Sequence, residues 1–307
     1  MSLLVVGSVA FDALETPFGK TDKIIGGSAT YFSLSSSFLT DAVNLVAVVG
    51  GDFPKESIEM LQKHKIDTKG LQVKEDEKTF FWSGKYHNDM NTRDTLVTEL
   101  NVLADFDPII PDQYQNCSYL MLGNLAPKVQ TSVIQRLKKR PKLIVMDTMN
   151  FWMDIALDDL KETMALVDVI CLNDEEARQL TGEFALVKAA KKIFSMGPKV
   201  VVIKKGEHGA LLFNKDQVFF APALPLEEVY DPTGAGDTFA GGFVGYLAST
   251  DDISFDNMKR AIIYGSALAS FCVEKFGPER LISLSAKELD ERILQFVELV
   301  QFEISLQ

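Results

Sequence analysis

Cysteine is scarce in this chain: there are three among 307 residues, Cys117, Cys171 and Cys272. They lie far apart, their number is odd, and no two form a CxxC pair, so their arrangement gives no sign of a disulfide framework. Each falls in an apolar stretch. This placement favours small buried side chains in a reducing compartment.

Basic residues are also in short supply. Lysine and arginine number 31 against 43 aspartates and glutamates, which gives a net charge of −12. Nucleic-acid binding would require a basic stripe, so we expect no such partner. There is no apolar run of about 18 residues that would span a membrane. The first residues, MSLLVVGSVAFD, lack the basic start of a signal peptide. We therefore expect a cytoplasmic protein that binds no membrane.

The sequence does contain short apolar runs that alternate with amphipathic segments. The runs that predict strands are 3–6, 45–49, 119–122, 143–146, 167–172, 200–203 and 210–213. The segments that predict helices are 30–38, 55–64, 129–139, 175–180, 186–194, 257–276 and 286–300. Several runs are apolar throughout, as in strands buried on both faces of a parallel sheet. The alternation predicts one α/β domain over 1–307, with a doubly wound, mostly parallel sheet and helices on both faces.

Residues 70–100 interrupt this rhythm. They alternate polar and apolar positions in the manner of strands and have no crossover helix. We expect a small antiparallel β sheet here, which residues 12–24 could join, placed as a lid over a cleft. The alternative is an edge hairpin that protects the sheet or mediates homodimer formation.

The segment with the clearest chemistry is DPTGAGDTFAGGF at 231–243. A glycine-rich turn that enters a helix presents unpaired N–H groups in one direction, which favours binding of an anion such as phosphate. Asp237 falls in the first turn of that helix, where the helix dipole favours its ionised form. An ionised carboxylate beside a phosphate site is suited to accept the proton of an attacking hydroxyl.

This segment closely resembles the signature of the ribokinase-like, or PfkB, sugar and nucleoside kinases. The resemblance implies a ribokinase-like fold, with Asp237 as the catalytic base and the amides of Gly234, Ala235 and Gly236 as the anion hole. It also places Thr233 at the nucleotide and, together with Asp231, near a monovalent-cation site that would hold K⁺. ATP and Mg²⁺ are the implied cosubstrate and cofactor.

Two segments near the N-terminus extend the resemblance to the phosphoryl acceptor. The glycine pair Gly26 and Gly27 precedes a predicted helix and lets a substrate approach the backbone closely. Asp12 follows the first strand and matches the acidic residue that binds acceptor hydroxyls in the family. A carboxylate suits a diol because it accepts two hydrogen bonds.

Two further segments resemble the family's nucleotide site. Asn173 and Glu176 form an N-x-x-E pair after a predicted strand, and the resemblance places them near Mg²⁺, through water. The same residue types also make a good helix N-cap, and these residues can cap a helix and lie near Mg²⁺ at the same time. The stretch 203–209 resembles K-x-G-x-x-G, in which Lys205 and Gly206 would contact phosphate and Gly209 would permit the turn.

The chain departs from the family pattern at the acceptor. Tyr31 stands where sugar kinases usually carry an asparagine, and Ala10 replaces a second one. Tyr31 would either stack on a substrate ring or belong to the core. Other candidates for substrate contact, or for support of the nucleotide and metal, are Asn91, Arg93, Asn124, Asp147 and Asn150.

The resulting hypothesis is an ATP-dependent kinase for a hydroxyl of a small sugar or polyol. A nucleoside kinase of the same family is the first alternative, and a nucleotide-binding sensor without turnover is the second. A dinucleotide-dependent oxidoreductase is excluded because no GxGxxG motif follows the first strand. The sequence at that place is GSVAFD.

Overall fold

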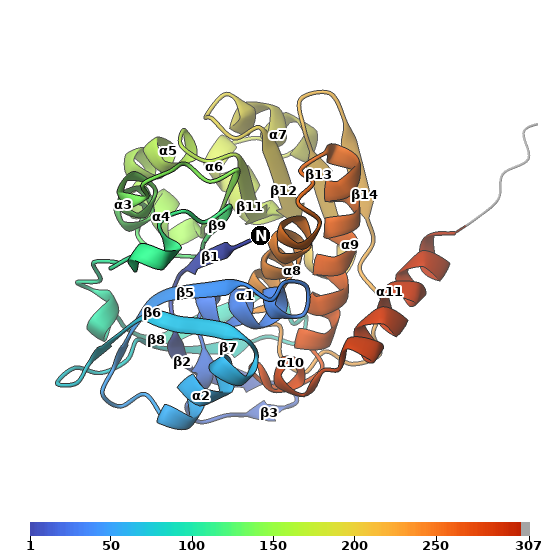
Figure 1. Cartoon of the computed structure of the whole chain (residues 1–307). Helices are drawn as coiled ribbons and strands as arrows, with labels where there is room; N and C mark the ends of the chain where they lie inside the picture. The colour runs from blue at the N-terminus through green and yellow to red at the C-terminus, as the bar shows by residue number, and fades with distance from the viewer. Residues whose placement is uncertain (302–307) are drawn as a thin grey trace, which may run out of the picture.

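The structure is a computed structural model that describes residues 1–301, and its centre is a nine-stranded sheet (Figure 1). The strands are β1 (Leu3–Val6), β5 (Val43–Gly50), β6 (Ile66–Lys74), β9 (Tyr119–Leu122), β10 (Leu143–Asp147), β11 (Val169–Asn173), β12 (Val200–Lys204), β13 (Ala210–Phe213) and β14 (Val218–Ala221). Their order is β14-β13-β12-β11-β10-β9-β1-β5-β6. All neighbours from β6 to β12 pair in parallel, whereas β13 and β14 are antiparallel additions at one edge. The predicted doubly wound α/β sheet is confirmed.

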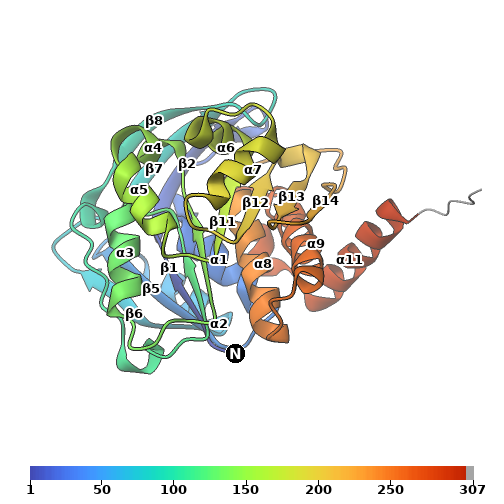
Figure 2. The same ribbon diagram turned by 90° about the horizontal axis from the view of Figure 1, so that it is seen from above.

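Helices cover both faces of this sheet, as Figure 2 shows from above. One face carries α1 (Ser28–Ser37), α2 (Lys55–Lys63), α8 (Ala235–Thr250), α9 (Phe255–Cys272), α10 (Glu279–Ser283) and α11 (Ala286–Val300). The other carries α3 (Pro127–Arg136), α4 (Asn150–Ile155), α5 (Leu157–Met164), α6 (Asp174–Thr181) and α7 (Leu186–Phe194). Short turns η1 (Asn101–Leu103), η2 (Asp112–Tyr114) and η3 (Gly206–His208) complete the elements.

The central strands are largely apolar because both faces of the sheet are buried there. In β1, Leu3 and Val5 belong to the core under α1 and α8, while Leu4 and Val6 belong to the opposite core. Each fully buried side chain of this size contributes roughly 1.5–3 kcal/mol of hydrophobic stabilisation. All three cysteines are buried and free, as expected. Among the described residues, no helix is both long and apolar enough to cross a membrane.

Helix α8 lies in close contact with both of its helical neighbours. A Cβ added to Gly241 would lie 2.6 Å from the carbonyl oxygen of Phe32 in α1, and one on Gly242 would lie 2.9 Å from Cα of Gly265 in α9. The hydroxyl of Ser36 donates a 2.8 Å hydrogen bond to the carbonyl of Gly241. These contacts fix the start of α8, which carries the glycine-rich turn.

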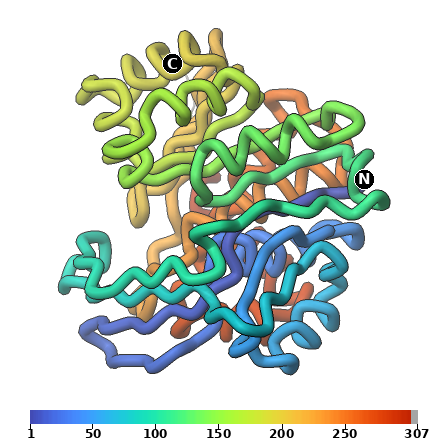
Figure 3. Tube along the Cα trace, turned by 90° about the vertical axis from the view of Figure 1, so that its left-hand side faces the viewer, coloured from blue at the N-terminus to red at the C-terminus, as the bar shows by residue number. Residues whose placement is uncertain are grey.

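The second sheet, which we expected to act as a lid, projects from the body in Figure 3 and is called the lid below. Its strands are β2 (Ala10–Thr16), β3 (Gly19–Lys20), β4 (Ile24–Gly26), β7 (Phe81–Tyr86) and β8 (Arg93–Glu99). Its pairings are antiparallel as predicted, except that β2 and β7 run parallel. Residues 70–74, which we expected at the start of the lid, instead belong to β6 at the edge of the large sheet. The reason is that β6 pairs in parallel with β5 up to Lys74, with one irregularity in register between Asp67 and Gly70.

Candidate active site

The glycine-rich turn adopts a backbone shape that only glycine accommodates easily. Gly234 has φ 74°, and a Cβ there would lie 2.4 Å from the ring of Tyr31. The N–H of Ala235 donates a 3.2 Å hydrogen bond to the carbonyl of Pro232. The N–H groups of Gly236 and Asp237 donate to no residue that the structure describes. Two amides at the start of α8 are therefore free to bind an anion.

Asp237 is partly accessible, but the protein around it excludes most water. This burial, reinforced by the nearby carboxylate of Asp147, raises the pKa of Asp237 to about 7, although Lys204 and Arg93 lower it. From the sequence we expected the helix dipole to favour the ionised form of Asp237; the net shift of its pKa is nevertheless upward, because burial is the largest contribution. A carboxyl group with a pKa near 7 is well matched to a general base at neutral pH.

Asp12 lies across the glycine pair. A Cβ on Gly26 would come within 1.8 Å of the Asp12 Oδ2 atom, and Gly27 has φ 91° where a Cβ would meet the carbonyl of Ser8 at 2.5 Å. Burial, followed by repulsion from Asp231 and Asp237, raises the pKa of Asp12 to about 8. The structure therefore brings Asp12 and Asp237, which are far apart in the sequence, into one electrostatic cluster.

Tyr31 belongs to the core, since 1% of it is exposed. Its ring packs on Gly234 and leaves no face free for a substrate to stack on. Its hydroxyl is buried and has no hydrogen-bond partner among the described residues. Burial, together with Cys272 and Asp12, raises the pKa of this hydroxyl, so it stays protonated and available as a donor.

Asp231 holds the turn in place. It is fully buried, and its two carboxylate oxygens accept 2.8 Å hydrogen bonds, one from the N–H of Thr233 and one from the N–H of Gly277. The Thr233 hydroxyl donates to the hydroxyl of Tyr86 in β7 at 3.1 Å. The signature turn is therefore tied to the lid and to the loop after α9.

Asn173 and Glu176 form a reciprocal capping box at the start of α6. The side chain of Asn173 accepts from the N–H of Glu176 at 2.7 Å, and the carboxylate of Glu176 accepts from the N–H of Asn173 at 2.7 Å. Burial raises the pKa of Glu176 to about 7. Asn173 is therefore the N-cap of α6, as one of the two interpretations predicted. The capping box holds Glu176 at the carboxyl end of β11, where ligands of open α/β sheets bind.

A buried ion pair that we did not predict lies at the same edge of the sheet. The ammonium of Lys204, at the end of β12, is 2.6 Å from Oδ2 of Asp147, at the end of β10. A Cβ added to Gly236 would lie 3.1 Å from Nζ of Lys204. The next residue, Lys205, which we expected to contact phosphate, closes a turn by a 2.8 Å hydrogen bond from its N–H to the carbonyl of Gly209.

The lid also reaches the turn that follows β12. Gly206 has φ 55°, and a Cβ there would lie 2.9 Å from the side-chain oxygen of Asn91 at the lid tip. Gly209 has φ 81° with the carbonyl of Ala221 only 2.0 Å from a Cβ position, so both glycines are required by the turn. Arg93 in β8 lies over the Trp82 ring at 5.9 Å and is close enough to lower the pKa of Asp237.

The side chains of Asn124 and Asn150 form hydrogen bonds with other groups of the protein. Asn124 accepts from the indole N–H of Trp152 at 2.7 Å, and its amide points at the sulfur of Met149 at 2.9 Å. Asn150 accepts a 3.1 Å bond from the N–H of Phe151. Both side chains shape the start of α4 at the end of β9 and β10.

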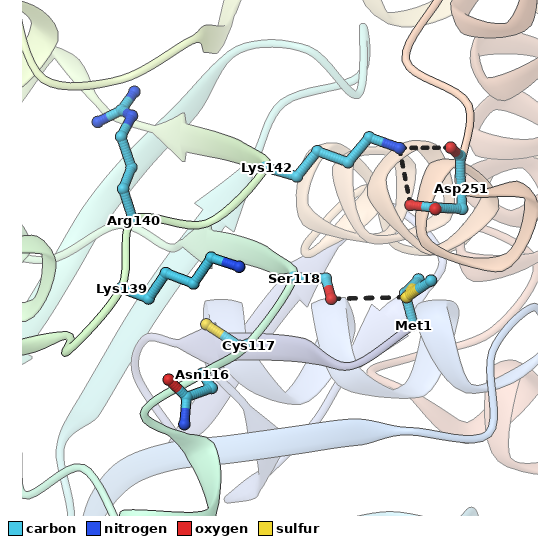
Figure 4. Close-up of a pocket in the computed structure, with 8 residues that line it drawn as sticks. All are labelled: Met1, Asn116, Cys117, Ser118, Lys139, Arg140, Lys142 and Asp251. Atoms are coloured by element: carbon cyan, nitrogen blue, oxygen red, sulfur yellow. Dashed lines mark hydrogen bonds and ion pairs between the residues drawn. The ribbon is translucent and has the colours of Figure 1, made fainter.

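The described residues contain no cluster of three or more histidine, cysteine, aspartate or glutamate side chains able to hold a metal ion alone. A cavity of about 270 Å³ lies at the opposite end of the sheet, before β1, β9 and β10 (Figure 4). There, Lys142 pairs with Asp251 at 2.8 Å. Asp251 is the one carboxylate among the residues that line this cavity, and no residue of the glycine-rich turn lines it.

Comparison with known proteins agrees with this arrangement. The pfkB family carbohydrate kinase model matches residues 4–283. The cytidine kinase of Thermococcus kodakarensis is 34% identical over 248 residues, which cover 80% of this chain and 87% of that protein. The nucleoside kinase of Methanothermobacter thermautotrophicus is 28% identical over 309 residues, covering 90% of this chain and 91% of that protein.

A solved structure shares the fold. The crystal structure of the Methanocaldococcus jannaschii nucleoside kinase, a member of the ribokinase family, superposes with a TM-score of 0.76 at 20% identity. It covers 96% of this chain and 99% of that one. This chain therefore belongs to the PfkB family of carbohydrate kinases, and it is a phosphotransferase that acts on a hydroxyl group.

Proposed function

We propose that this protein transfers the γ-phosphate of ATP to a hydroxyl of a nucleoside, with Asp237 as the general base. The observation that carries the proposal is the position of Asp237. It is partly accessible, surrounded by protein, and next to two free amides at the start of α8. Its pKa of about 7 lets it both lose and accept a proton near neutral pH.

Two observations favour a nucleoside over a free sugar. The two relatives described above are a cytidine kinase and a nucleoside kinase. Tyr31 lies in the core at the position where sugar kinases of the family usually carry an asparagine, so this site lacks that side-chain amide. Asp12 remains beside Gly26 and Gly27. A carboxylate over a glycine pair suits the two neighbouring hydroxyls of a ribose ring.

In the proposed mechanism the acceptor hydroxyl attacks the γ-phosphorus in line with the departing ADP oxygen. Asp237 removes the hydroxyl proton as the new bond forms. The amides of Gly236 and Asp237 donate to the phosphoryl oxygens as negative charge builds on them. The lid contacts made by Asn91 and Tyr86 exclude water that would otherwise hydrolyse ATP.

Mg²⁺ fits this site as a partner of the nucleotide. Mg²⁺ prefers oxygen ligands and keeps several waters, so one carboxylate plus phosphate oxygens is enough. Glu176, held by its capping box with Asn173, is the carboxylate that would hold the ion through water. Bound there, Mg²⁺ would neutralise phosphate charge. A K⁺ site at Asp231 and Thr233 stays a prediction, and such an ion would share carboxylate oxygens that already accept two N–H groups.

A homodimer through the lid is a further part of the proposal. Every residue of β8 is exposed, including the apolar Leu96 at 54% and Val97 at 41%. An exposed edge strand with apolar side chains favours pairing with a second copy. Light scattering should show a dimer for the wild type and a monomer for Leu96→Glu. A monomeric wild type would refute the proposed homodimer.

The kinase proposal is tested by an ADP-release assay with cytidine, uridine, inosine, adenosine, ribose and fructose as acceptors. We expect turnover with at least one nucleoside. Asp237→Asn should lower kcat by at least about 1,000-fold, within the range by which lost base and electrostatic catalysis slow enzymes, while ATP binding persists. Exposed Asp216→Asn is the matched control. Near-normal turnover by Asp237→Asn would refute the assignment of the base. If the wild-type protein bound ATP tightly but turned over none of these acceptors, the result would support the sensor alternative.

A further inference from the structure

A cluster of cations lies at the end of the large sheet opposite Asp237. The segment KKRPK, residues 138–142, connects α3 to β10 and carries four basic side chains. Those of Lys139, Arg140 and Lys142 line the cavity of about 270 Å³ in Figure 4. The chain as a whole has a net charge of −12, yet Asp251 is the one carboxylate in this lining. The charge around this cavity is therefore opposite in sign to that of the whole chain.

Hydrogen bonds between three segments fix the walls of the cavity. The N–H of Lys142 donates to the carbonyl of Ser118 at 2.8 Å, which joins the residues before β10 to those before β9. The hydroxyl of Tyr119, the first residue of β9, donates to Oδ1 of Asp251 at 3.0 Å, and Nζ of Lys142 lies 2.8 Å from the same oxygen. The cavity is therefore formed before any ligand arrives, which lowers the cost of binding one.

Lys139 differs from the other basic residues of the segment because no carboxylate among the described residues lies within ion-pair distance of it. Figure 4 shows its ammonium directed toward Ser118, whereas the guanidinium of Arg140 is directed away. The other three cations each lie within 3.0 Å of a carboxylate: Lys138 of Asp112, Arg140 of Asp168 and Lys142 of Asp251. The full charge of Lys139 is thus available to an anion in the cavity.

Neutral hydrogen-bond donors add to this charge. The N–H groups of Asn116, Lys139 and Arg140 donate to no residue that the structure describes. The hydroxyl of Ser118 faces only the sulfur of Met1, at 3.6 Å, and a thioether is a weak acceptor. An oxyanion can accept hydrogen bonds from all of these groups, so the lining suits an oxyanion better than a cation.

The size and position of the cavity limit what it can bind. Its volume is below the roughly 300 Å³ at which pockets for drug-sized molecules begin, so a small anion fits better than a whole nucleotide. Asp237 lies in the first turn of α8, and Asp251 follows the last turn of this 16-residue helix. A helix of that length spans about 24 Å. An anion in the cavity is therefore too far from Asp237 to take part in phosphoryl transfer.

We propose that this cavity is a binding site for a small dianionic phosphate group, either inorganic phosphate or a small phosphate monoester, held by the ammonium groups of Lys139 and Lys142. Hydrogen bonds from ammonium groups to phosphate are charge-assisted and stronger than neutral ones. The site does not depend on the proposed kinase function. It does reach α8, because Lys142 also donates to the carbonyl and to Oδ1 of Asp251 at the C-terminal end of that helix.

The first test is an NMR titration of the full chain with inorganic phosphate at constant ionic strength, while Mg²⁺ and β,γ-imido-ATP fill the kinase site. The N–H signals of Asn116, Lys139 and Arg140 should shift saturably with a Kd on the order of 1 mM, as expected for two charge-assisted hydrogen bonds. Chloride should give no saturable shift. The absence of saturation with phosphate, or an equal response to chloride, would overturn the proposal. This readout is local to the cavity, so it holds even if the protein turns over no acceptor.

The second test compares two neighbouring lysines. Lys139→Met should weaken phosphate binding about 10-fold or more, as for loss of a charge-assisted hydrogen bond, and Lys139→Arg should keep most of the affinity. Lys138→Met is the matched control, with the same change in charge one residue away. It should stay within about twofold of the wild type, because the charge of Lys138 is already offset by Asp112. Equal affinities in Lys138→Met and Lys139→Met would overturn the proposal. Because Lys139 is exposed and unpaired among the described residues, its variants should keep the Tm of the wild type in phosphate-free buffer.

Glycerol 3-phosphate and CMP distinguish the sources of the phosphate group in the same titration. Tighter binding of glycerol 3-phosphate than of inorganic phosphate would identify a monoester as the ligand, and the reverse order would identify the free ion. CMP should bind more weakly than either, because its ring and sugar exceed the cavity. CMP binding as tight as that of the smaller anions would contradict a site for a small phosphate group.

Discussion

Replacing Asp12 by asparagine should stabilise the free protein at neutral pH while it destroys acceptor binding. The pKa of Asp12 is raised from 3.8 to about 8, mainly by burial. Between these two values the unfolded chain has lost the proton and the folded protein keeps it. The folded state then binds more protons, so stability falls as pH rises through this window.

The size of the effect follows from the two pKa values. Each pKa unit corresponds to 1.36 kcal/mol, so Asp12 costs about 5 kcal/mol of folding free energy near pH 7.5. Asparagine removes this cost but brings an amide that must find a buried partner, at roughly 2 kcal/mol. We expect a net gain of about 3 kcal/mol, which for 307 residues corresponds to a rise in Tm of about 5 °C.

Urea and thermal unfolding at two pH values provide the assay. Near pH 5 the same calculation leaves a cost of only about 2 kcal/mol, which the cost of burying the amide offsets, so the gain should almost vanish. The control is Glu15→Gln on the same strand β2. Its carboxylate pairs with Lys85 at 2.5 Å, an interaction that lowers its pKa, so this variant should gain nothing. An Asp12→Asn variant that is less stable near pH 7.5, or whose gain is equal at both pH values, would refute the reasoning.

Three further predictions concern the nucleotide half of the site. Because the base must be ionised and its pKa is about 7, kcat/KM of the wild type should fall below neutral pH, and a pH–rate profile with no limb near that value would contradict Asp237. Gly234→Ala places a methyl group 2.4 Å from the Tyr31 ring at a φ of 74°. We therefore expect the free energy of unfolding in urea to fall by roughly 2–3 kcal/mol and most of the activity to be lost. A stable, active variant would show that the turn adapts. Asn173→Ala removes half of the capping box with Glu176, which should cost about 1 kcal/mol and raise KM for ATP; steady-state kinetics with an unchanged KM would make this box purely structural.

Seven of the nine strands of the large sheet could be predicted from the sequence because burial on both faces makes them largely apolar, whereas the edge strands β6 and β14 were not predicted. The predicted run 210–213 matches β13, and 186–194 matches α7. The lid boundary failed at residues 70–74, where exposed positions of an edge strand in a large sheet look like those of a separate hairpin. Pairing partners decide such a case, and a strand's own residues do not reveal them.

The site was predictable where one segment supplies both backbone and side chain. The turn from Asp231 to Asp237 needs glycine for its shape and places its own carboxylate in the first turn of α8. The charge cluster was different, because Asp12, Asp147 and Lys204 come from three strands. A sequence shows that each follows an apolar run, but their common direction depends on register.

Lys204 illustrates what was missed and what signal was present. Two lysines follow one another after β12, and only one can point toward the face that α8 covers. The strand is buried from Val201 to Ile203, and Val202 packs in the core beneath α8. Alternation then assigns Lys204 to the site and directs Lys205 to the other face. The same burial that identifies this lysine also explains why the pKa of Asp237 is raised instead of lowered. A cleft dry enough to protect a phosphoryl group from water opposes every charge within it, so its base needs a nearby cation to ionise.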